Sequence, residues 1–208
     1  MSASTTLIYW SLNARATPSF IVAALGDVAL EWDDGTANSW PAAKPSAPFG
    51  QLPLLKDGDL TLGQSFALVR YLAKKGGVQG EDLVHFGISE MITEEASDLF
   101  GGLVKAKYDA DPLAGFNKLF SETLTTQAGF LENLLKGDFF GGDKALQGDA
   151  ALFAVLYLYK RANAELLSTV LAAHPKLNAW FARFAALPNI AKAVGVLDAK
   201  GAYFTWPQ

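Results

Sequence analysis

The chain has 208 residues, a formal net charge of −4 and no cysteine. Half of its residues are hydrophobic, which is enough to build one large domain or two small ones. The acidic balance provides no basic field to attract nucleic acid, and the lack of cysteine excludes disulfides, thiolate metal sites and a cysteine nucleophile.

Targeting and metal-binding signals are weak along the whole chain. The first residues show no charged segment followed by an apolar core, and the apolar run 150–159 is too short to span a bilayer. His85 and His174 have no metal-ligand spacing, and His174-Pro175 reads as a helix boundary. We therefore expect a cytoplasmic protein without a metal site.

The first elements form a strand–helix–strand pattern. Residues 5–10 are rich in β-branched and aromatic side chains, which favour a strand. Apolar residues recur at helical spacing over residues 15–25, and Gly26 supplies a stop. Residues 28–32 read as a second strand. This order within about thirty residues is typical of a parallel βαβ unit.

A long segment of small and polar residues, 33–49, follows the second strand. A loop of this length in a compact domain is usually functional or disordered. It contains Trp40 and Lys44, and an indole in such a loop either packs on the core or lines a site.

Residues 48–72 predict a hairpin followed by a helix. Asp57-Gly58 is a two-residue turn signal between apolar runs, and Gln64-Ser65 opens the helix. Leu52 precedes Pro53, so its backbone is extended and free to pair with a peptide ligand. The free N–H groups of a helix N-terminus favour an anion. Together these features indicate a site for a small peptide that carries a carboxylate.

The second half of the chain shows helical patterns alone. Residues 78–82 read as a linker, Gly101-Gly102 interrupts the first helix after it, and residues 203–206 form an aromatic tail. The result is an α/β first half of about 75 residues and an all-helical second half. The helices expected are 83–108, 113–135, 149–171 and one bracketed by Pro175 and Pro188. The helix 149–171 is apolar almost all round in its first half, so we expect it to be the buried central helix.

These motifs together resemble the cytosolic glutathione S-transferases of the tyrosine type, such as the sigma, pi and mu classes. The resemblance covers nearly the whole chain. It rests on Tyr9-Trp10 with Arg15, Trp40 and Lys44, the run 48–53, Gln64-Ser65, Arg70-Tyr71-Leu72 and Asp98.

The resemblance implies a fold and an assembly. We expect a thioredoxin-like, glutathione-binding domain over residues 1–77, and an all-helical domain over 83–208 that contributes the electrophile site and dimer contacts. The protein would be a homodimer in which Phe49 inserts into the partner subunit.

The resemblance also implies an enzyme that uses glutathione as co-substrate. Tyr9 would donate a hydrogen bond to the glutathione sulfur, and Arg15 would support it electrostatically. The main chain of Leu52, before a cis Pro53, would pair with the cysteinyl unit, and Asp98 would reach the γ-glutamyl ammonium in the neighbouring subunit. The glycyl end would meet Trp40, Lys44 and Gln51, and the γ-glutamyl carboxylate would meet Gln64 and Ser65.

The second substrate would be a small hydrophobic electrophile bound between the domains. We expect its walls to include Trp10, Leu12, Tyr108 and the tail residues Phe204 and Trp206. Ordinary core packing is the alternative for Tyr108 and for the tail.

Some positions depart from the family pattern. Ser11 to Arg15 lacks the usual Gly-Arg pair, Gly63 stands where a bulkier residue is usual, and Leu146 replaces the Ser or Thr that caps the buried helix. Losing a cap hydroxyl costs about 1 kcal/mol. Gly101-Gly102 would loosen the helix beside the electrophile site.

The residues leave two alternatives to a glutathione transferase function. One is a non-catalytic glutathione-binding or structural protein of the same fold, against which Tyr9, Lys44 and Gln64-Ser65 argue. The other is a glutathione-dependent isomerase or peroxidase that uses the same thiolate. Cysteine-dependent redox chemistry is excluded by composition.

Overall fold

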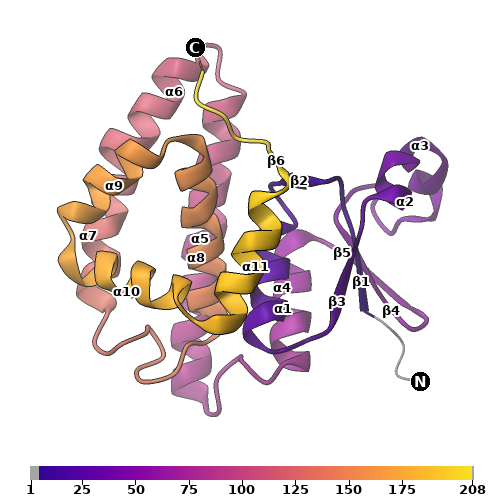
Figure 1. Cartoon of the computed structure of the whole chain (residues 1–208), viewed down its shortest axis with the longest axis horizontal. Coiled ribbons are helices and arrows are strands. Elements are labelled where there is room, and N and C mark those ends of the chain that lie inside the picture. Colours follow the sequence, from indigo (N-terminus) through magenta and orange to yellow (C-terminus); the bar gives the residue numbers. More distant parts are fainter. Residues whose placement is uncertain (1–4, 208) are drawn as a thin grey trace.

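The computed structural model describes residues 5–207. A four-stranded sheet lies on one side and the long helices lie on the other (Figure 1). The sheet has the order β3-β1-β4-β5, with β1 parallel to β3 and antiparallel to β4. This is the predicted β-α-β followed by β-β-α. The elements are β1 (Thr5–Ile8), α1 (Thr17–Leu25), β3 (Leu30–Asp33), β4 (Leu54–Asp57), β5 (Leu60–Gly63) and α4 (Ser65–Lys75).

The first strand ends two residues earlier than its β-rich composition predicts. Leu7 and Ile8 are buried in the core, and strand pairing stops at Ile8 opposite Asp33. Tyr9 stays tied to β3, because its amide donates to the Asp33 carbonyl (3.1 Å) and its own carbonyl accepts from Trp32 Nε1 (3.0 Å). The chain therefore delivers Tyr9 to a fixed position at the end of a central strand.

The segment after β3 contains short helical turns where the composition predicted a loop. They are α2 (Gly35–Asn38), α3 (Trp40–Ala43) and the 3₁₀ turn η1 (Lys44–Ser46). The Asp33 carboxylate accepts from the Thr36 amide (2.9 Å), which satisfies a free N–H of α2.

The helical part is built around α5 (Leu83–Lys107) and α8 (Gln147–Ala162), which pack together. Most of α8 is buried on all sides, as its apolar sequence predicted. The predicted helix 149–171 is divided, because Asn163 accepts from the Leu166 amide (3.0 Å) and caps a new helix. The other elements are α6 (Pro112–Lys118), the π-helical turn η2 (Leu119–Leu124), α7 (Thr125–Leu134), α9 (Ala164–Ala172) and α10 (Pro175–Ala185).

Two features near the C-terminus were not predicted. Pro188 begins a helix, α11 (Pro188–Asp198), which packs against α1. A short strand, β6 (Gly201–Ala202), then pairs in parallel with β2 (Leu12–Asn13). Asn13 Nδ2 also donates to the Leu197 carbonyl (2.8 Å). These contacts fix the tail beside the loop that follows β1.

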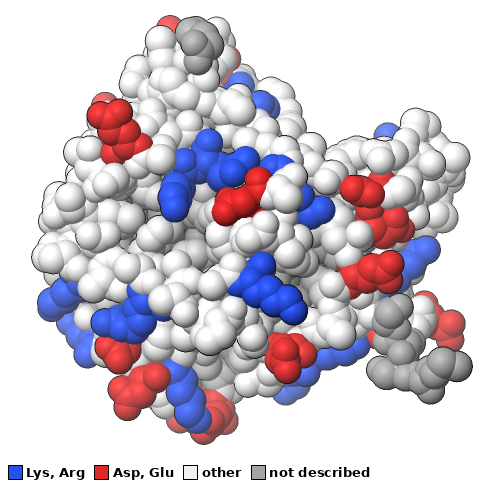
Figure 2. Space-filling view, viewed as in Figure 1, with Lys and Arg blue, Asp and Glu red and all other residues white. Residues whose placement is uncertain are grey.

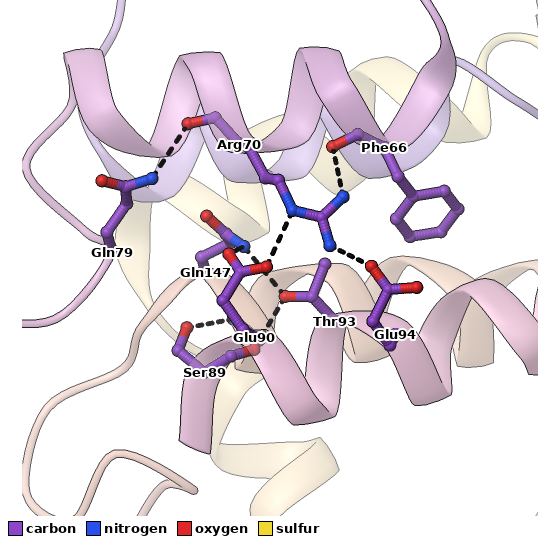
Figure 3. Close-up of polar contacts among 9 residues, drawn as sticks. Phe66, Arg70, Gln79, Ser89, Glu90, Thr93, Glu94 and Gln147 are labelled. Atoms are coloured by element: carbon purple, nitrogen blue, oxygen red, sulfur yellow. Dashed lines mark hydrogen bonds and ion pairs between the residues drawn. The ribbon is translucent and has the colours of Figure 1, made fainter. Parts of the chain in front are cut away.

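A polar network fixes the sheet-bearing part against the helices (Figure 3). Arg70 on α4 donates to Glu90 (2.7 Å) and also bonds Glu94, both on α5. Gln147, at the start of α8, donates to Glu90 (2.7 Å) and to Thr93 (3.0 Å). Three helices are therefore held at one point, where Glu90 is shared between α4 and α8.

The glycine pair Gly101-Gly102 does not interrupt α5, which runs unbroken from Leu83 to Lys107. The predicted interruption is therefore wrong. A Cβ on Gly102 would lie 2.7 Å from Leu119 Cδ1, whereas a Cβ on Gly101 would face open space. Gly102 thus allows close packing of α5 against η2.

Charges are mixed on the outer surface. On the face shown in Figure 2, a short row of basic side chains on the helical half lies beside acidic ones. This face offers no extended basic surface of the kind that binds nucleic acid. Within residues 5–207, no helix is both long and apolar enough to cross a membrane.

Candidate active site

The N-terminal cavity, of about 360 Å³, lies at the mouth of the β4–β5 hairpin. It collects residues from the loop after β1, the helical turns after β3, the hairpin and the start of α4. Six residues of the predicted glutathione site line it: Trp40, Gln51, Leu52, Pro53, Gln64 and Ser65. Its remaining walls are Trp10, Arg15, Phe49, Gly50 and Gly63.

Leu52 and Pro53 are joined by a cis peptide bond, as expected from the resemblance. They lie immediately before β4, whose pairing with β1 begins at Leu54 opposite Ile8. The main chain of Leu52 therefore borders the cavity outside the paired register of the sheet. An extended peptide lying in the cavity can pair with it.

The start of α4 forms the other wall. Gln64 adopts φ +72°, a left-handed conformation that a non-glycine residue rarely takes. Residues held in such conformations cluster at ligand-binding and active sites. Gln64 is also the N-cap of α4, and no side chain in the described part of the chain caps that helix end. The free amides and positive dipole end of α4 thus suit a carboxylate.

Three residues of the predicted glutathione site do not line this cavity: Tyr9, which lies in the cavity described next, Lys44 and Asp98. Lys44 is exposed, but its stem passes Gly50 on the rim: a Cβ on Gly50 would lie 3.4 Å from Lys44 Cε. Asp98 is exposed on α5 and is not among the lining residues. Within one subunit, Lys44 is therefore at the edge of the site and Asp98 is outside it.

The junction cavity, of about 200 Å³, lies between the sheet-bearing part and α5. It includes Tyr9 and the predicted electrophile-site residues Trp10, Leu12, Tyr108 and Phe204. Trp10, Arg15 and Leu52 line both cavities, so the two are adjacent. A ligand in the N-terminal cavity can thus place a reactive group beside one in the junction cavity.

Tyr9 is 5 % exposed at the end of β1. Burial raises the pKa of its hydroxyl to about 12, although the backbone amide and the guanidinium of Arg15 act to lower it. The hydroxyl is therefore protonated at neutral pH and can donate a hydrogen bond. Its ring packs edge-on against Trp10, with centroids 5.3 Å apart.

Sequence reasoning missed four residues of the junction cavity: Ala14, Phe100, Val104 and Tyr203. Phe100 and Val104 precede Tyr108 at intervals of four, so they share its face of α5, and that spacing could have identified them. Tyr203 follows β6, which has no recognisable strand pattern.

Trp206, expected in the electrophile wall, lies elsewhere. Its ring packs against Phe116 and Phe120, with centroids 5.7 and 5.6 Å away, in the helical core. The tail runs from β6 towards α6, which carries this residue away from the cavity (Figure 1). Phe204 instead turns inward, 1 % exposed, against Phe100.

Comparisons with known proteins identify the family. A family model described as "Glutathione S-transferase, C-terminal domain" matches residues 97–194. The chain is also 32% identical over 197 residues to "Glutathione S-transferase P 1" of Xenopus laevis, covering 89% of each protein. The chain belongs to the glutathione S-transferase family.

Two further similarities concern this transferase. It is 30% identical over 190 residues to "Hematopoietic prostaglandin D synthase" of Gallus gallus, covering 89% of the chain and 92% of that protein. The solved Pi-class glutathione S-transferase of Onchocerca volvulus superposes with a TM-score of 0.84 at 26% identity, covering 94% of both chains. The predictions of a glutathione transferase fold and of a glutathione transferase enzyme are confirmed.

Proposed function

We propose that this transferase uses the Tyr9 hydroxyl to stabilise the thiolate of glutathione for attack on a small hydrophobic electrophile. The observation that carries the proposal is the position of Tyr9. It is a buried, protonated hydroxyl in the junction cavity, which shares Trp10, Arg15 and Leu52 with the N-terminal cavity.

Glutathione is the co-substrate that fits the N-terminal cavity. Its cysteinyl unit would pair with the main chain of Leu52 beside Pro53, and its γ-glutamyl carboxylate would meet Gln64 and Ser65 at the start of α4. The glycyl carboxylate would be held by Trp40, Lys44 and Gln51. Lys44 reaches it from the rim, since its four-carbon stem is flexible.

The chemistry needs an ionised sulfur. A free thiol has a pKa of about 8.5 and is mostly protonated at neutral pH. A hydrogen bond donated by Tyr9 favours the thiolate, and the nearby cation of Arg15 adds to it. Lowering the thiol pKa by about two units requires about 2.7 kcal/mol. The thiol proton leaves to solvent, because Tyr9 keeps its own proton, and the thiolate then attacks the electrophile in the junction cavity.

The assembly belongs to the same proposal. The Phe49 side chain is 66 % exposed at the rim of the N-terminal cavity, an unfavourable position for a large aromatic ring in a monomer. We expect it to insert into a second copy, which would also bring Asp98 of the partner subunit to the γ-glutamyl ammonium. Sedimentation of Phe49→Ser should therefore show a larger monomer fraction than wild type. We place this dimer in the cytoplasm.

The test begins with retention on immobilised glutathione, followed by conjugation of a chloronitrobenzene. Tyr9→Phe should still bind the resin yet lose most of its turnover. Tyr71→Phe is the matched control, because its hydroxyl bonds Asp57 outside both cavities, and its turnover should stay near wild type. Unchanged turnover in Tyr9→Phe would contradict the role of Tyr9, and resin binding without any wild-type turnover would favour a non-catalytic binder.

A second activity is supported by the similarity to a prostaglandin D synthase. A glutathione-dependent isomerase would use the same Tyr9-stabilised thiolate, without net consumption of glutathione. Measuring glutathione consumption alongside product formation, with a prostaglandin endoperoxide as substrate, separates the two reactions.

A further inference from the structure

Tyr9 lies just past the last paired residue of β1, and its main-chain carbonyl needs a donor there. β1 pairs with β3 as far as Ile8 opposite Asp33, and the Tyr9 amide continues this ladder to the Asp33 carbonyl (3.1 Å). In a continued parallel ladder the Tyr9 carbonyl would next accept from the amide of Gly35, but Gly35 begins α2. The indole Nε1 of Trp32 donates to that carbonyl instead (3.0 Å). A side chain therefore replaces the sheet at the residue that carries the proposed catalytic hydroxyl.

The Trp32 ring also contacts the Tyr9 side chain. Its centroid lies 6.3 Å from that of the Tyr9 ring and 5.4 Å from that of Phe20 on α1, and both pairs are edge-on. Edge-on aromatic pairs are favourable beyond the area that they bury. Trp32 thus holds Tyr9 through its main chain and through its ring, and both decide where the Tyr9 hydroxyl lies.

Trp32 is itself held by the C-terminal segment. Lys200, between α11 and β6, places its ammonium 4.3 Å from the centroid of the Trp32 ring, within the range of a cation–π contact. The Lys200 main chain is fixed, because its amide donates to the Leu197 carbonyl (2.9 Å) and its carbonyl accepts from Asn13 Nδ2 (3.4 Å). Across residues 5–207, Lys200 makes no ion pair that would draw its charge away from the indole.

Trp32 lines neither the N-terminal cavity nor the junction cavity, so it acts on the reaction through Tyr9. We propose that Trp32 is a positioning residue: it fixes the main chain and ring of Tyr9 so that the hydroxyl meets the glutathione sulfur, and Lys200 supports it. This inference rests on the proposed function, since it needs the thiolate that Tyr9 stabilises.

The position of the Tyr9 hydroxyl matters because hydrogen bonds weaken steeply as their angle departs from linear. A misplacement of about 1 Å at a reacting centre can lower a rate by about a hundredfold. Without the Trp32 N–H, the Tyr9 carbonyl loses its donor, and the main chain of Tyr9 can turn towards water. The hydrogen bond from its hydroxyl to the sulfur is then weaker, and the thiol keeps its proton to a higher pH.

Trp32→Phe tests this role, because it keeps an aromatic ring and removes the N–H. We expect the pKa of bound glutathione, titrated by thiolate absorbance, to rise by about half a unit, a threefold effect typical of a weak net hydrogen bond. Turnover of a chloronitrobenzene about one pH unit below the wild-type thiol pKa should fall about threefold and approach wild type well above it. KM for glutathione should stay within about twofold, because Trp32 lies outside the cavity.

Trp206→Phe is the matched control, since Trp206 packs on Phe116 and Phe120 in the helical core. It makes the same change of side chain away from Tyr9, and it should leave the thiol pKa and turnover unchanged.

A double-mutant cycle separates positioning from a general loss of order. In the Tyr9→Phe background, Trp32→Phe should cause no further loss of turnover, because the hydroxyl that it positions is absent. An unchanged thiol pKa in Trp32→Phe, or equal losses of turnover in both backgrounds, would overturn the inference and leave the proposed function intact. Wild-type turnover in Tyr9→Phe alone would overturn both.

Lys200→Met tests the support of the indole and keeps its N–H. Lys200 is only partly buried, so this variant should fold even if Trp32→Phe does not. The thiol pKa should rise, but by less than in Trp32→Phe, because the cation restrains the ring without bonding to Tyr9. An unchanged thiol pKa would overturn the role given to Lys200.

Discussion

The guanidinium of Arg15 lies over the ring of Phe100, 5.2 Å from its centroid. This contact joins the loop after β1 to α5 and fixes the cation where the N-terminal and junction cavities meet. A guanidinium has less freedom when it is stacked on an aromatic face. Phe100 therefore positions the charge that acts on Tyr9 and, by proposal, on the glutathione sulfur.

We expect Arg15→Leu to raise the pKa of enzyme-bound glutathione by about one unit, equivalent to about 1.4 kcal/mol of lost thiolate stabilisation. Titration of thiolate absorbance in the binary complex measures this directly. Turnover near pH 7 should fall about threefold, because raising the thiol pKa from about 6.5 to about 7.5 lowers the thiolate fraction by about that factor, and it should recover at higher pH, where the thiol ionises unaided. Lys56→Met removes a cation on β4 outside both cavities and should leave the titration unchanged. A wild-type titration in Arg15→Leu would exclude this role.

The pH dependence of kcat/KM should reflect ionisation of the glutathione thiol and not of the Tyr9 hydroxyl. The pKa of Tyr9 is raised to about 12, so its hydroxyl remains protonated through the neutral and mildly alkaline range. We expect kcat/KM to rise with pH through the pKa of bound glutathione and then to stay level up to about pH 10, the pKa of an unperturbed tyrosine. A decline well below that value, if it persists in Tyr71→Phe and does not follow the enzyme's stability profile, would show that Tyr9 ionises early.

The raised pKa of Tyr9 also makes the free energy of unfolding depend on pH. The unfolded chain binds the Tyr9 proton with an ordinary pKa of about 10, whereas the folded chain holds it to about 12. The folded state therefore binds more protons over this interval, and the contribution of Tyr9 to stability is present below pH 10 and falls as pH rises towards 12. Urea unfolding of wild type and Tyr9→Phe should show that their stability difference changes over this interval and is constant below it.

Most of the fold and much of the candidate site could be predicted because their signals are local. The hairpin turn at Asp57-Gly58, the helix start at Gln64-Ser65 and the apolar run of α8 each depend on neighbouring residues alone. The base of the hairpin and the helix start border the N-terminal cavity, so the spacing of motifs was sufficient to group Leu52, Pro53, Gln64 and Ser65.

What could not be predicted depends on contacts between distant segments. Phe204 and Trp206 share the same aromatic tail, yet Phe204 faces the junction cavity and Trp206 packs on α6 and η2. The two-residue strands β2 and β6 are too short for any periodicity, although their pairing decides where the tail goes. Tyr203 reaches the cavity only because of that pairing.

The two adjacent glycines of α5 should respond oppositely to alanine. Gly101→Ala adds a methyl into open space and should stabilise the protein by about 0.5–1 kcal/mol, the difference in helix propensity. Gly102→Ala places a methyl against the buried Leu119 and should destabilise it by about 1–2 kcal/mol through overpacking. Urea unfolding of the two variants gives the comparison. Similar effects from both would mean that α5 and η2 are not packed as closely as described.

At the start of α8, the N-cap residue Leu146 contributes apolar packing in place of a side-chain hydrogen bond. Leu146 occupies the N-cap position without a hydroxyl, but its amide and that of Phe140 donate to the Asp149 carboxylate (2.9 and 3.0 Å). Trp180 Nε1 supplies a third donor at 2.8 Å. Burial raises the pKa of Asp149, and these three donors oppose that shift. The Leu146 side chain is itself buried beside Gly141, so it adds apolar contact where a serine would add a hydrogen bond.

We therefore expect Leu146→Ser to lower the free energy of unfolding by about 1 kcal/mol. The new cap contributes about 1 kcal/mol, whereas exposing the space left by a buried leucine costs about 2 kcal/mol or more. Leu146→Ala removes the packing without supplying the cap, and it should be the less stable of the two by about the value of the cap. Urea unfolding of both variants beside wild type measures each difference. If Leu146→Ser were more stable than wild type, the missing hydroxyl would be an uncompensated loss, and the packing of Leu146 against Gly141 would contribute little.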